Sequence, residues 1–541
     1  MGIPFGGYPM SFFRNESKKN KKQSHDQNEN TDLRKSGNIP LYSDLNANLD
    51  KIKSELGNSS DLIIRHFELG SFQAQAAAVF VDTLIDNKLV DEFILGSLMI
   101  NTAQESHNNI EADKSVFDFI KDNARTIREV QVVTSWNELI MSVFSGDTVI
   151  LIDGWAQGIS GSTRGGEFRS ITESSSQVVI RGPKDGFTES ISTNISLVRR
   201  RIKSPNLWLE HMKIGDVTQT DIGIMYIKGI VNDKLVKEVK DRLQAIEIDA
   251  ILESGYIEDL IQDETFTPFP TMLNTERPDS VAGNLLEGRV AIFIDGTPFV
   301  LVAPTTFFSY FQSVEDYYQR FDIGFAIRLL RYLAFFISLL GPSIYIAAIT
   351  FHQEMIPTAL LISLAAQRDG VPFPAFVEAV MMEITFEILR EAGVRMPRAI
   401  GQAVSIVGAL VLGQAAVQAG IISAAMVIVV AITGIASFAV PVFNLAISVR
   451  LLRFLIMVFA ASTGFYGIAI IMIMIIGHLC SLRSFGVPYM APFAPFNLPD
   501  QDDAILHFPL WARLTRPHLT GKKNNKRMKN HLAPTPGPEE K

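Results

Sequence analysis

Three long stretches of this chain contain no Asp, Glu, Lys or Arg. They are Tyr332–Phe351, Ala399–Val449 and Phe454–Ser481. An α-helix rises ~1.5 Å per residue, so ~20 apolar residues cross the ~30 Å hydrocarbon core of a bilayer. Each stretch is long enough for one crossing, and the middle one is long enough for two. We therefore predict an all-α multipass membrane domain over residues 321–485, with spans at 332–351, 399–418, 421–440 and 454–479.

The two ends of the chain are polar. Residues 1–40 are rich in Asn, Lys, Ser and Gln and predict a disordered arm, whereas residues 486–541 form a basic tail. No apolar signal-peptide core follows the lysines near the N-terminus, so we expect the soluble N-terminal region to stay cytoplasmic. Arg328 and Arg331 precede the first apolar stretch and agree with that side, because cytoplasmic flanks are enriched in basic residues.

The soluble region contains an internal duplication. The sequence VFVDTLIDNKLV at 79–90 matches MYIKGIVNDKLV at 225–236, and SGDTVILIDG at 145–154 matches LEGRVAIFIDG at 286–296. Both matches occur in the same order and at nearly the same offset. The short β-branched runs 149–152 and 290–294 read as buried strands, each followed by an Asp-Gly turn, and 233–248 has the periodicity of a helix. We predict an α/β region of two similar subdomains, 41–195 and 196–320.

Two local features of the soluble region have competing interpretations. Basic residues cluster at 199–203, which indicates either a lipid-headgroup contact or, as we favour, a solvated helix face or an interdomain ion pair with an acidic neighbour such as Glu210. The glycine-rich run 154–166 lacks the Gly-Lys-Ser/Thr of a phosphate loop and reads as a flexible loop that carries Arg164.

Composition and motifs exclude several functions. The single cysteine, Cys480, cannot form an internal disulfide or a cysteine cluster, and the nine histidines show no metal-ligand spacing. The formal net charge of −8 argues against nucleic-acid binding. Since no nucleophile elbow, zinc helix or kinase motif is present either, we expect no metal, no cofactor and no enzymatic activity.

One mostly apolar segment, residues 373–397, carries four carboxylates. Glu383, Glu387 and Glu391 follow four-residue spacing and share a helix face, whereas Glu378 points elsewhere. Arg390 and Arg395 lie three and four residues after a glutamate, so an interfacial helix with internal ion pairs is one interpretation. The other is a pore lining, because rings of carboxylates select cations. Pore-lining candidates are Glu378, Glu383, Glu387, Glu391, Gln414 and Gln418, although the two glutamines equally suit a helix–helix hydrogen bond.

The sequence allows two numbers of membrane crossings, four or five. Four spans return the basic tail to the cytoplasmic side but leave Arg450 and Arg453 outside. If residues 373–390 also cross, the arginines move inside and the tail moves out. We favour the even count. The segment 355–366 is too short to span upright and resembles a re-entrant helix.

Several long stretches resemble one protein family, the A subunits of GerA-type spore germination receptors. They are RGPKDGFTESISTNISLVRRRIK (181–203), ILESGYIEDLIQD (251–263), PFPTMLNTERPD (268–279), LLEGRVAIFIDGTPFVL (285–301), QSVEDYY (312–318) and PFPAFVEAVMMEITFEILREAGVRMP (372–397). The resemblance extends from about residue 41 to residue 500.

The resemblance implies a function that composition does not. Such A subunits act with a multipass B subunit and a lipoprotein C subunit in the spore inner membrane, where the complex senses nutrients. The A subunit is thought to oligomerise and to form a path for monovalent cations. A paralogous sporulation-operon membrane protein has the same architecture and is the nearest alternative.

Two further classes of function remain as rivals. A secondary transporter commonly shows repeats in its membrane part, whereas the repeat here is in the soluble part. An inert scaffold would make no use of the carboxylates in the membrane region.

Overall fold

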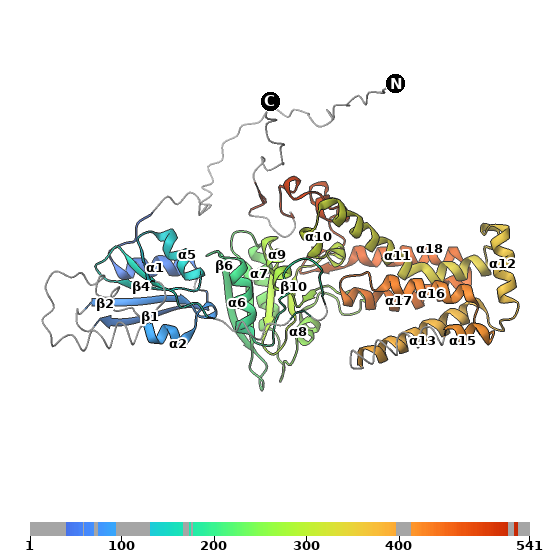
Figure 1. Cartoon of the computed structure of the whole chain (residues 1–541), viewed down its shortest axis with the longest axis horizontal. Helices are drawn as coiled ribbons and strands as arrows, with labels where there is room; N and C mark the ends of the chain where they lie inside the picture. The colour runs from blue at the N-terminus through green and yellow to red at the C-terminus, as the bar shows by residue number, and fades with distance from the viewer. Residues whose placement is uncertain are drawn as a thin grey trace, which may run out of the picture.

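The computed structural model describes residues 39–57, 59–69, 74–93, 130–165, 173–174, 177–395, 413–517 and 524–528. Figure 1 shows three bodies in a row: a first α/β unit, a second α/β unit and a helical region. The predicted polar arm, up to residue 38, lies outside the described residues, as does most of the predicted span 399–418.

The first unit is a five-stranded antiparallel sheet with the strand order β1-β2-β4-β5-β3. Helices α1 and α5 cover one face of the sheet with one apolar core, and α2 lies against the other. Along β2, successive side chains alternate between these two cores, so both faces of the strand are buried. Its elements are α1 (Leu45–Glu55), β1 (Leu62–Leu69), β2 (Ala74–Val81), α2 (Asn87–Asp91), β3 (Val130–Val133), α5 (Trp136–Phe144), β4 (Thr148–Ile152) and β5 (Gly158–Gly161).

The second unit repeats this arrangement. Its sheet has the order β6-β7-β9-β10-β8, with α6 and α9 on one face and α7 and α8 on the other. Its elements are α6 (Ile191–Arg201), β6 (Leu207–Ile214), β7 (Thr220–Ile227), α7 (Asp233–Gln244), α8 (Ser254–Ile261), β8 (Leu273–Thr275), α9 (Pro278–Leu286), β9 (Val290–Ile294) and β10 (Val300–Ala303). The shared strand order agrees with the predicted duplication, and α7 ends four residues before the predicted 248.

The Asp-Gly turns perform the same task in both units. Gly154 and Gly296 take φ values of +85° and +88°, a left-handed conformation that glycine adopts without strain. The preceding aspartates then reach the first helix of their own unit. The backbone N–H of Leu45 donates to Asp153 at 3.1 Å, and the N–H of Ile191 donates to Asp295 at 3.0 Å. Each turn therefore fixes the start of a helix, which explains why this dipeptide recurs.

The prediction of a flexible loop at 154–166 is wrong for the central part of this segment. Residues Gly158–Gly161 form β5, a fully buried strand between β3 and β4. A Cβ atom on Gly158 would lie 3.2 Å from the carbonyl oxygen of Ile150, so the small residues serve close backbone packing. Arg164 forms an ion pair with Asp147 at 2.7 Å.

Helix α6 joins the two units. The helix follows the first unit in sequence, but it packs on β7, β9 and α9 of the second unit. The predicted domain boundary at 195/196 therefore falls inside α6. At its other end Arg199 forms a buried ion pair with Asp61 of the first unit, at 2.5 Å. Arg201 pairs with Asp185 at 2.6 Å. The interdomain ion-pair interpretation of the basic cluster is therefore confirmed for Arg199, but its partner is Asp61, whereas the suggested Glu210 pairs with Lys240.

The helical region follows α10 (Glu315–Tyr318) and packs in one bundle (Figure 1). Helix α11 contacts α13, α16 and α17, and α17 contacts α18. The helices are α11 (Phe321–Thr350), α12 (Thr358–Arg368), α13 (Ala375–Arg395), α15 (Gly413–Gln418), α16 (Ala424–Ser437), α17 (Phe443–Thr463) and α18 (Phe465–Ser481). Among the described residues, α11 and α17 are long and apolar enough to cross a membrane, and α16 and α18 are shorter apolar helices.

The span predicted at 454–479 is wrong in its bounds. Gly464, with φ +67°, ends α17 and starts α18, and a Cβ atom at this position would lie 2.6 Å from the ring of His352, beyond the end of α11. Helix α17 instead begins at Phe443, which places Arg450 and Arg453 inside an apolar helix. The prediction failed because it took these arginines as the end of a span, whereas charges are tolerated within one when they have buried partners.

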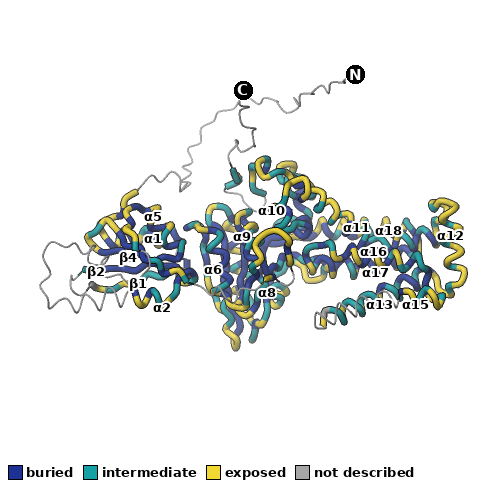
Figure 2. Tube along the Cα trace, in the orientation of Figure 1, coloured by how far each residue is buried: buried dark blue, intermediate teal, exposed yellow. Residues whose placement is uncertain are grey.

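The remaining predicted segments take distinct positions. Helix α12 overlaps the re-entrant segment predicted at 355–366 and ends two residues beyond it; it lies at the far end of the helical region, and none of its residues is buried (Figure 2). Helix α13, predicted as interfacial or pore-lining, packs against the bundle.

The chain after α18 returns to the second unit. Phe485 joins the core under α7 and α8, and the buried Tyr489 donates a hydrogen bond to the carbonyl oxygen of Pro270 at 2.7 Å. The Oγ of Ser484 donates to the carbonyl oxygen of Thr271, also at 2.7 Å. The described part of the predicted basic tail therefore lies at the same end of the helical region as the α/β units.

Candidate functional site

The carboxylates of α13 meet basic side chains of the neighbouring helices, and this series of ion pairs is the candidate site. The first is Glu378, which is fully buried near the far end of the bundle. It accepts hydrogen bonds from the backbone N–H and the Oγ of Ser423, at 2.9 and 2.8 Å, where α16 begins. Arg368 of α12 lies 3.2 Å from its other oxygen. Glu378 therefore joins α12, α13 and α16.

The second pair is Glu383 with Arg453 of α17. Their side chains are 1% exposed, and the Nη1 of Arg453 donates to the Glu383 carboxylate at 2.5 Å. Arg453 also donates to the backbone oxygen and the Oγ of Ser338 in α11, at 2.7 and 2.9 Å. A carboxylate and a guanidinium removed from water need such partners, because an unpaired buried charge costs several kcal/mol. This pair fixes α11, α13 and α17 together.

The third carboxylate, Glu387, has two arginines. Arg390 of the same helix lies at 3.1 Å, and Arg450 of α17 lies at 2.9 Å. Arg390 also donates to the Oγ of Ser437 at 2.9 Å, and its guanidinium lies over the ring of Phe438. Since Glu383 pairs with residue 453 and Glu387 with residue 450, α13 and α17 run antiparallel along this series.

The last carboxylate lies outside the bundle. Glu391 is 65% exposed and pairs with Arg395 at 2.6 Å. The predicted local pairs of Arg390 and Arg395 are thus confirmed. Gln414 and Gln418 of α15 are exposed. The structure therefore separates the predicted candidates into two buried carboxylates, one shared carboxylate and exposed polar groups.

Sequence reasoning missed Arg450 and Arg453 as partners. Two spacings in the sequence carried a signal for this pairing. The two arginines are three residues apart and lie between two charge-free stretches, and the glutamates of 373–397 are four residues apart. On antiparallel helices such spacings place each arginine beside one carboxylate.

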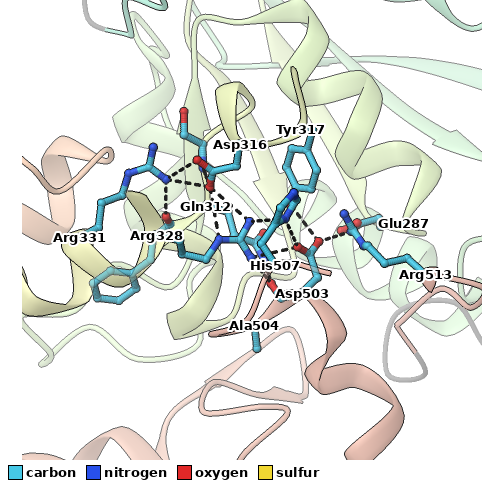
Figure 3. A network of polar contacts seen from close by, with 12 residues as sticks. Glu287, Gln312, Asp316, Tyr317, Arg328, Arg331, Asp503, Ala504, His507 and Arg513 are labelled. Carbon is cyan, nitrogen blue, oxygen red and sulfur yellow. Dashed lines mark hydrogen bonds and ion pairs between the residues drawn. The ribbon is translucent and has the colours of Figure 1, made fainter. Parts of the chain in front are cut away.

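A second polar network joins the helical region to the second unit (Figure 3). Arg328 is fully buried in α11 and donates to Asp316 at 3.2 Å and to Asp503 at 3.0 Å. Arg331 donates to Asp316 at 2.8 Å. Asp503 also contacts Arg513, and it accepts from Tyr317 at 2.8 Å. The start of α11, the α10 segment and the C-terminal segment therefore form one rigid junction.

The charges of this junction determine the protonation state of Asp503. Burial alone raises the pKa of a carboxyl group, but the hydrogen bond from His507 and the guanidinium charges of Arg513 and Arg328 bring the pKa of Asp503 below its usual value. Asp503 is therefore ionised at neutral pH and holds both arginines.

Within the described ranges, no group of three or more His, Cys, Asp or Glu side chains is arranged to hold a metal ion. The thiol of Cys480 is exposed.

Comparisons with known proteins give one consistent result. The family model described as "Bacillus/Clostridium GerA spore germination protein" matches residues 50–519. Spore germination protein KA of Bacillus subtilis (strain 168) is 55% identical over 490 residues, which cover 90% of this chain and 89% of that protein. Spore germination protein B1 of the same organism is 40% identical over 491 residues, covering 91% of this chain and 100% of that protein.

Among solved structures, the crystal structure of the N-terminal domain of the A subunit of the Bacillus megaterium spore germinant receptor GerK3 is similar to this chain. It is 46% identical and covers 50% of this chain and 98% of its own, with a TM-score of 0.40. The family match extends over both α/β units, the helical region and the C-terminal junction. The chain therefore belongs to the GerA family of spore germination proteins.

Proposed function

We propose that this chain is the A subunit of a nutrient-sensing germinant receptor and that its copies assemble around a path for cations. The first part rests on the relatives, whose names describe spore germination proteins. In this proposal the chain is a multipass subunit of the spore inner membrane, and its N-terminal region lies on the cytoplasmic side. Its partners are a multipass B subunit, a lipoprotein C subunit and membrane lipid. The role is one of sensing and conduction, without catalysis or cofactor.

The observation that carries the conduction proposal is an exposed stripe on α13. Ile384, Ile388 and Glu391 follow helical spacing and are 48%, 63% and 65% exposed. In water an apolar stripe of this kind is unfavourable, so it suits a lipid or a neighbouring subunit. If copies pack along it, the Glu391 carboxylates gather near one axis. A negative ring lowers the barrier for cations and raises it for anions.

The buried glutamates have a different role in this proposal. Glu383 and Glu378 are buried and pair with arginines of other helices, so they stabilise the helix arrangement and do not line the path. The pair of Glu391 with Arg395 is different, because it lies within one helix and is exposed to screening. Glu387 is 27% exposed and is shared by two arginines. Of the six pore-lining candidates, Glu391 is therefore the one that we propose to line the path, followed by the exposed Gln414 and Gln418.

The test is cation flux through liposomes that contain the full chain with its B and C subunits. We expect nutrient-dependent flux, reduced in Glu391→Gln, which keeps the side-chain size and removes the charge. Glu264→Gln is the matched control, because Glu264 is also exposed but lies in the second α/β unit. Equal flux in the parent and Glu391→Gln would refute the role of this residue. Absence of nutrient-dependent cation flux in the assembled parent complex would refute conduction.

A further inference from the structure

We infer that the cavity between the second α/β unit and the helical region is a binding site for an anionic phosphate group. The cavity has a volume of about 500 Å³. One wall comes from the second unit and the α10 segment, with Thr275 and Ser313. The other comes from the ends of α13, α16 and α17. This size is typical of sites for small molecules or headgroups.

The walls of the cavity are rich in arginine. Arg277, Arg331, Arg390 and Arg450 line it, together with the carboxylate Glu315. Arg277 already pairs with Asp279, and Arg331 with Asp316, so these two are partly neutralised. The remaining two, on the membrane side, share one carboxylate.

Arg390 and Arg450 are short of negative charge. Glu387 is their common partner, so two guanidinium groups share one carboxylate. The Nε–H of Arg390 is buried and has no hydrogen-bond acceptor among the described residues. A buried donor without an acceptor is costly, and guanidinium groups bind phosphate oxygens through paired N–H donors. An anion at this place would supply the missing charge and acceptor.

The position of the cavity favours a phospholipid headgroup as the source of the phosphate. Phe438 and Phe443 line it beside the arginines and are 69% and 62% exposed. They lie where α16 ends and α17 begins, at the end of the bundle nearest the α/β units. Aromatic side chains beside basic pockets at helix ends are typical of the headgroup layer. The same guanidinium chemistry also binds free phosphate, so the two sources are separated by experiment.

The experiment measures binding directly on the full chain purified in detergent. Short-chain phosphatidylglycerol, short-chain phosphatidylcholine and inorganic phosphate are titrated separately by calorimetry. We expect saturable binding of phosphatidylglycerol and weaker binding of inorganic phosphate. If inorganic phosphate binds as tightly as phosphatidylglycerol, free phosphate is the source and the site stands. If no phosphate compound shows saturable binding, the inference is overturned.

Variants of Arg390, Arg450 and Glu387 separate binding from folding. Arg390→Gln and Arg450→Gln should each weaken binding by about tenfold, equivalent to the loss of one charge-assisted contact. Arg395→Gln should have no effect, because Arg395 lies on the same helix but does not line the cavity. Glu387→Gln should tighten binding, since it removes the competing carboxylate.

The last variant decides between a site and a structural role. If Glu387→Gln weakens binding as much as the arginine variants do, these residues only hold the helices together and the inference is overturned. The same conclusion follows if the double variant Arg390→Gln and Arg450→Gln binds like the parent. Because the readout is binding and not flux, the outcome is independent of the conduction proposal.

Discussion

Arg453 and Glu383 face each other across α17 and α13 at 2.5 Å, and both side chains are almost completely buried. We predict that Arg453→Ala destabilises the full chain by roughly 3–5 kcal/mol, because it leaves Glu383 buried without its partner. The double variant Arg453→Gln and Glu383→Gln should recover most of this loss. Thermal unfolding in detergent measures the effect. Arg395→Ala, which breaks an exposed pair, is the control, and equal stability of the two single variants would contradict the prediction.

The ion pair between Asp61 and Arg199 should determine how the two α/β units are held together. Asp61→Ala leaves Arg199 buried, with Ser59 and the backbone of Leu207 as its remaining polar contacts. We predict a loss of roughly 3–5 kcal/mol in unfolding by urea and faster proteolysis between the units. Asp91→Ala, which removes an exposed partner of Arg65, should change neither. A variant with normal protease resistance would show that the pair does not hold the interface.

Substitution by alanine should lower the stability at two glycines and raise it at a third. Gly154 and Gly296 have positive φ, and a Cβ atom at either would meet nothing within 4 Å. Alanine there should therefore destabilise by about 1 kcal/mol for backbone reasons alone, and by a similar amount in both units. Gly283 lies inside α9 with equally open space, so Gly283→Ala should stabilise by roughly 0.5–1 kcal/mol. Urea unfolding checks the signs, and a stabilising Gly296→Ala would contradict the assigned conformation.

Glu258 should make the second unit sensitive to pH. Burial, with the charges of Asp259 and Glu253, raises the pKa of Glu258 to about 7. A carboxyl group whose folded pKa is raised stabilises the fold at low pH, and this contribution is lost as pH rises from the ordinary value of ~4.3 through 7. We predict that Glu258→Gln raises the melting temperature at pH 8 and changes it little at pH 5. Glu264→Gln is the exposed control, and a gain that is the same at both pH values would exclude this mechanism.

The features of the fold that were predictable from sequence were local ones. The Asp-Gly dipeptides after β4 and β9 determine a turn and a helix start within a short segment, so their repetition predicted the repeated units. The buried runs at 149–152 and 290–294 likewise contained enough β-branched residues to identify strands.

Contacts between distant segments were not predictable in the same way. The partner of Arg199 is 138 residues away, and the partner of Arg453 is 70 residues away. The strand at Gly158–Gly161 contains two glycines and a single apolar side chain, that of Ile159, so its burial follows mainly from its neighbours. For the candidate site, sequence spacing found the carboxylates of α13 and its local arginines, but only the packing of α17 shows which carboxylates are neutralised.

The return of Phe485 and Tyr489 to the second unit has a consequence for biosynthesis. A chain made from its N-terminus completes β10 long before these two residues leave the ribosome, because the described helices α11 to α18 are made in between. The second unit must therefore keep part of its interior open to solvent during that interval. Its last core side chains arrive only when α18 has brought the chain back to that unit, so the second unit is completed after the helical region.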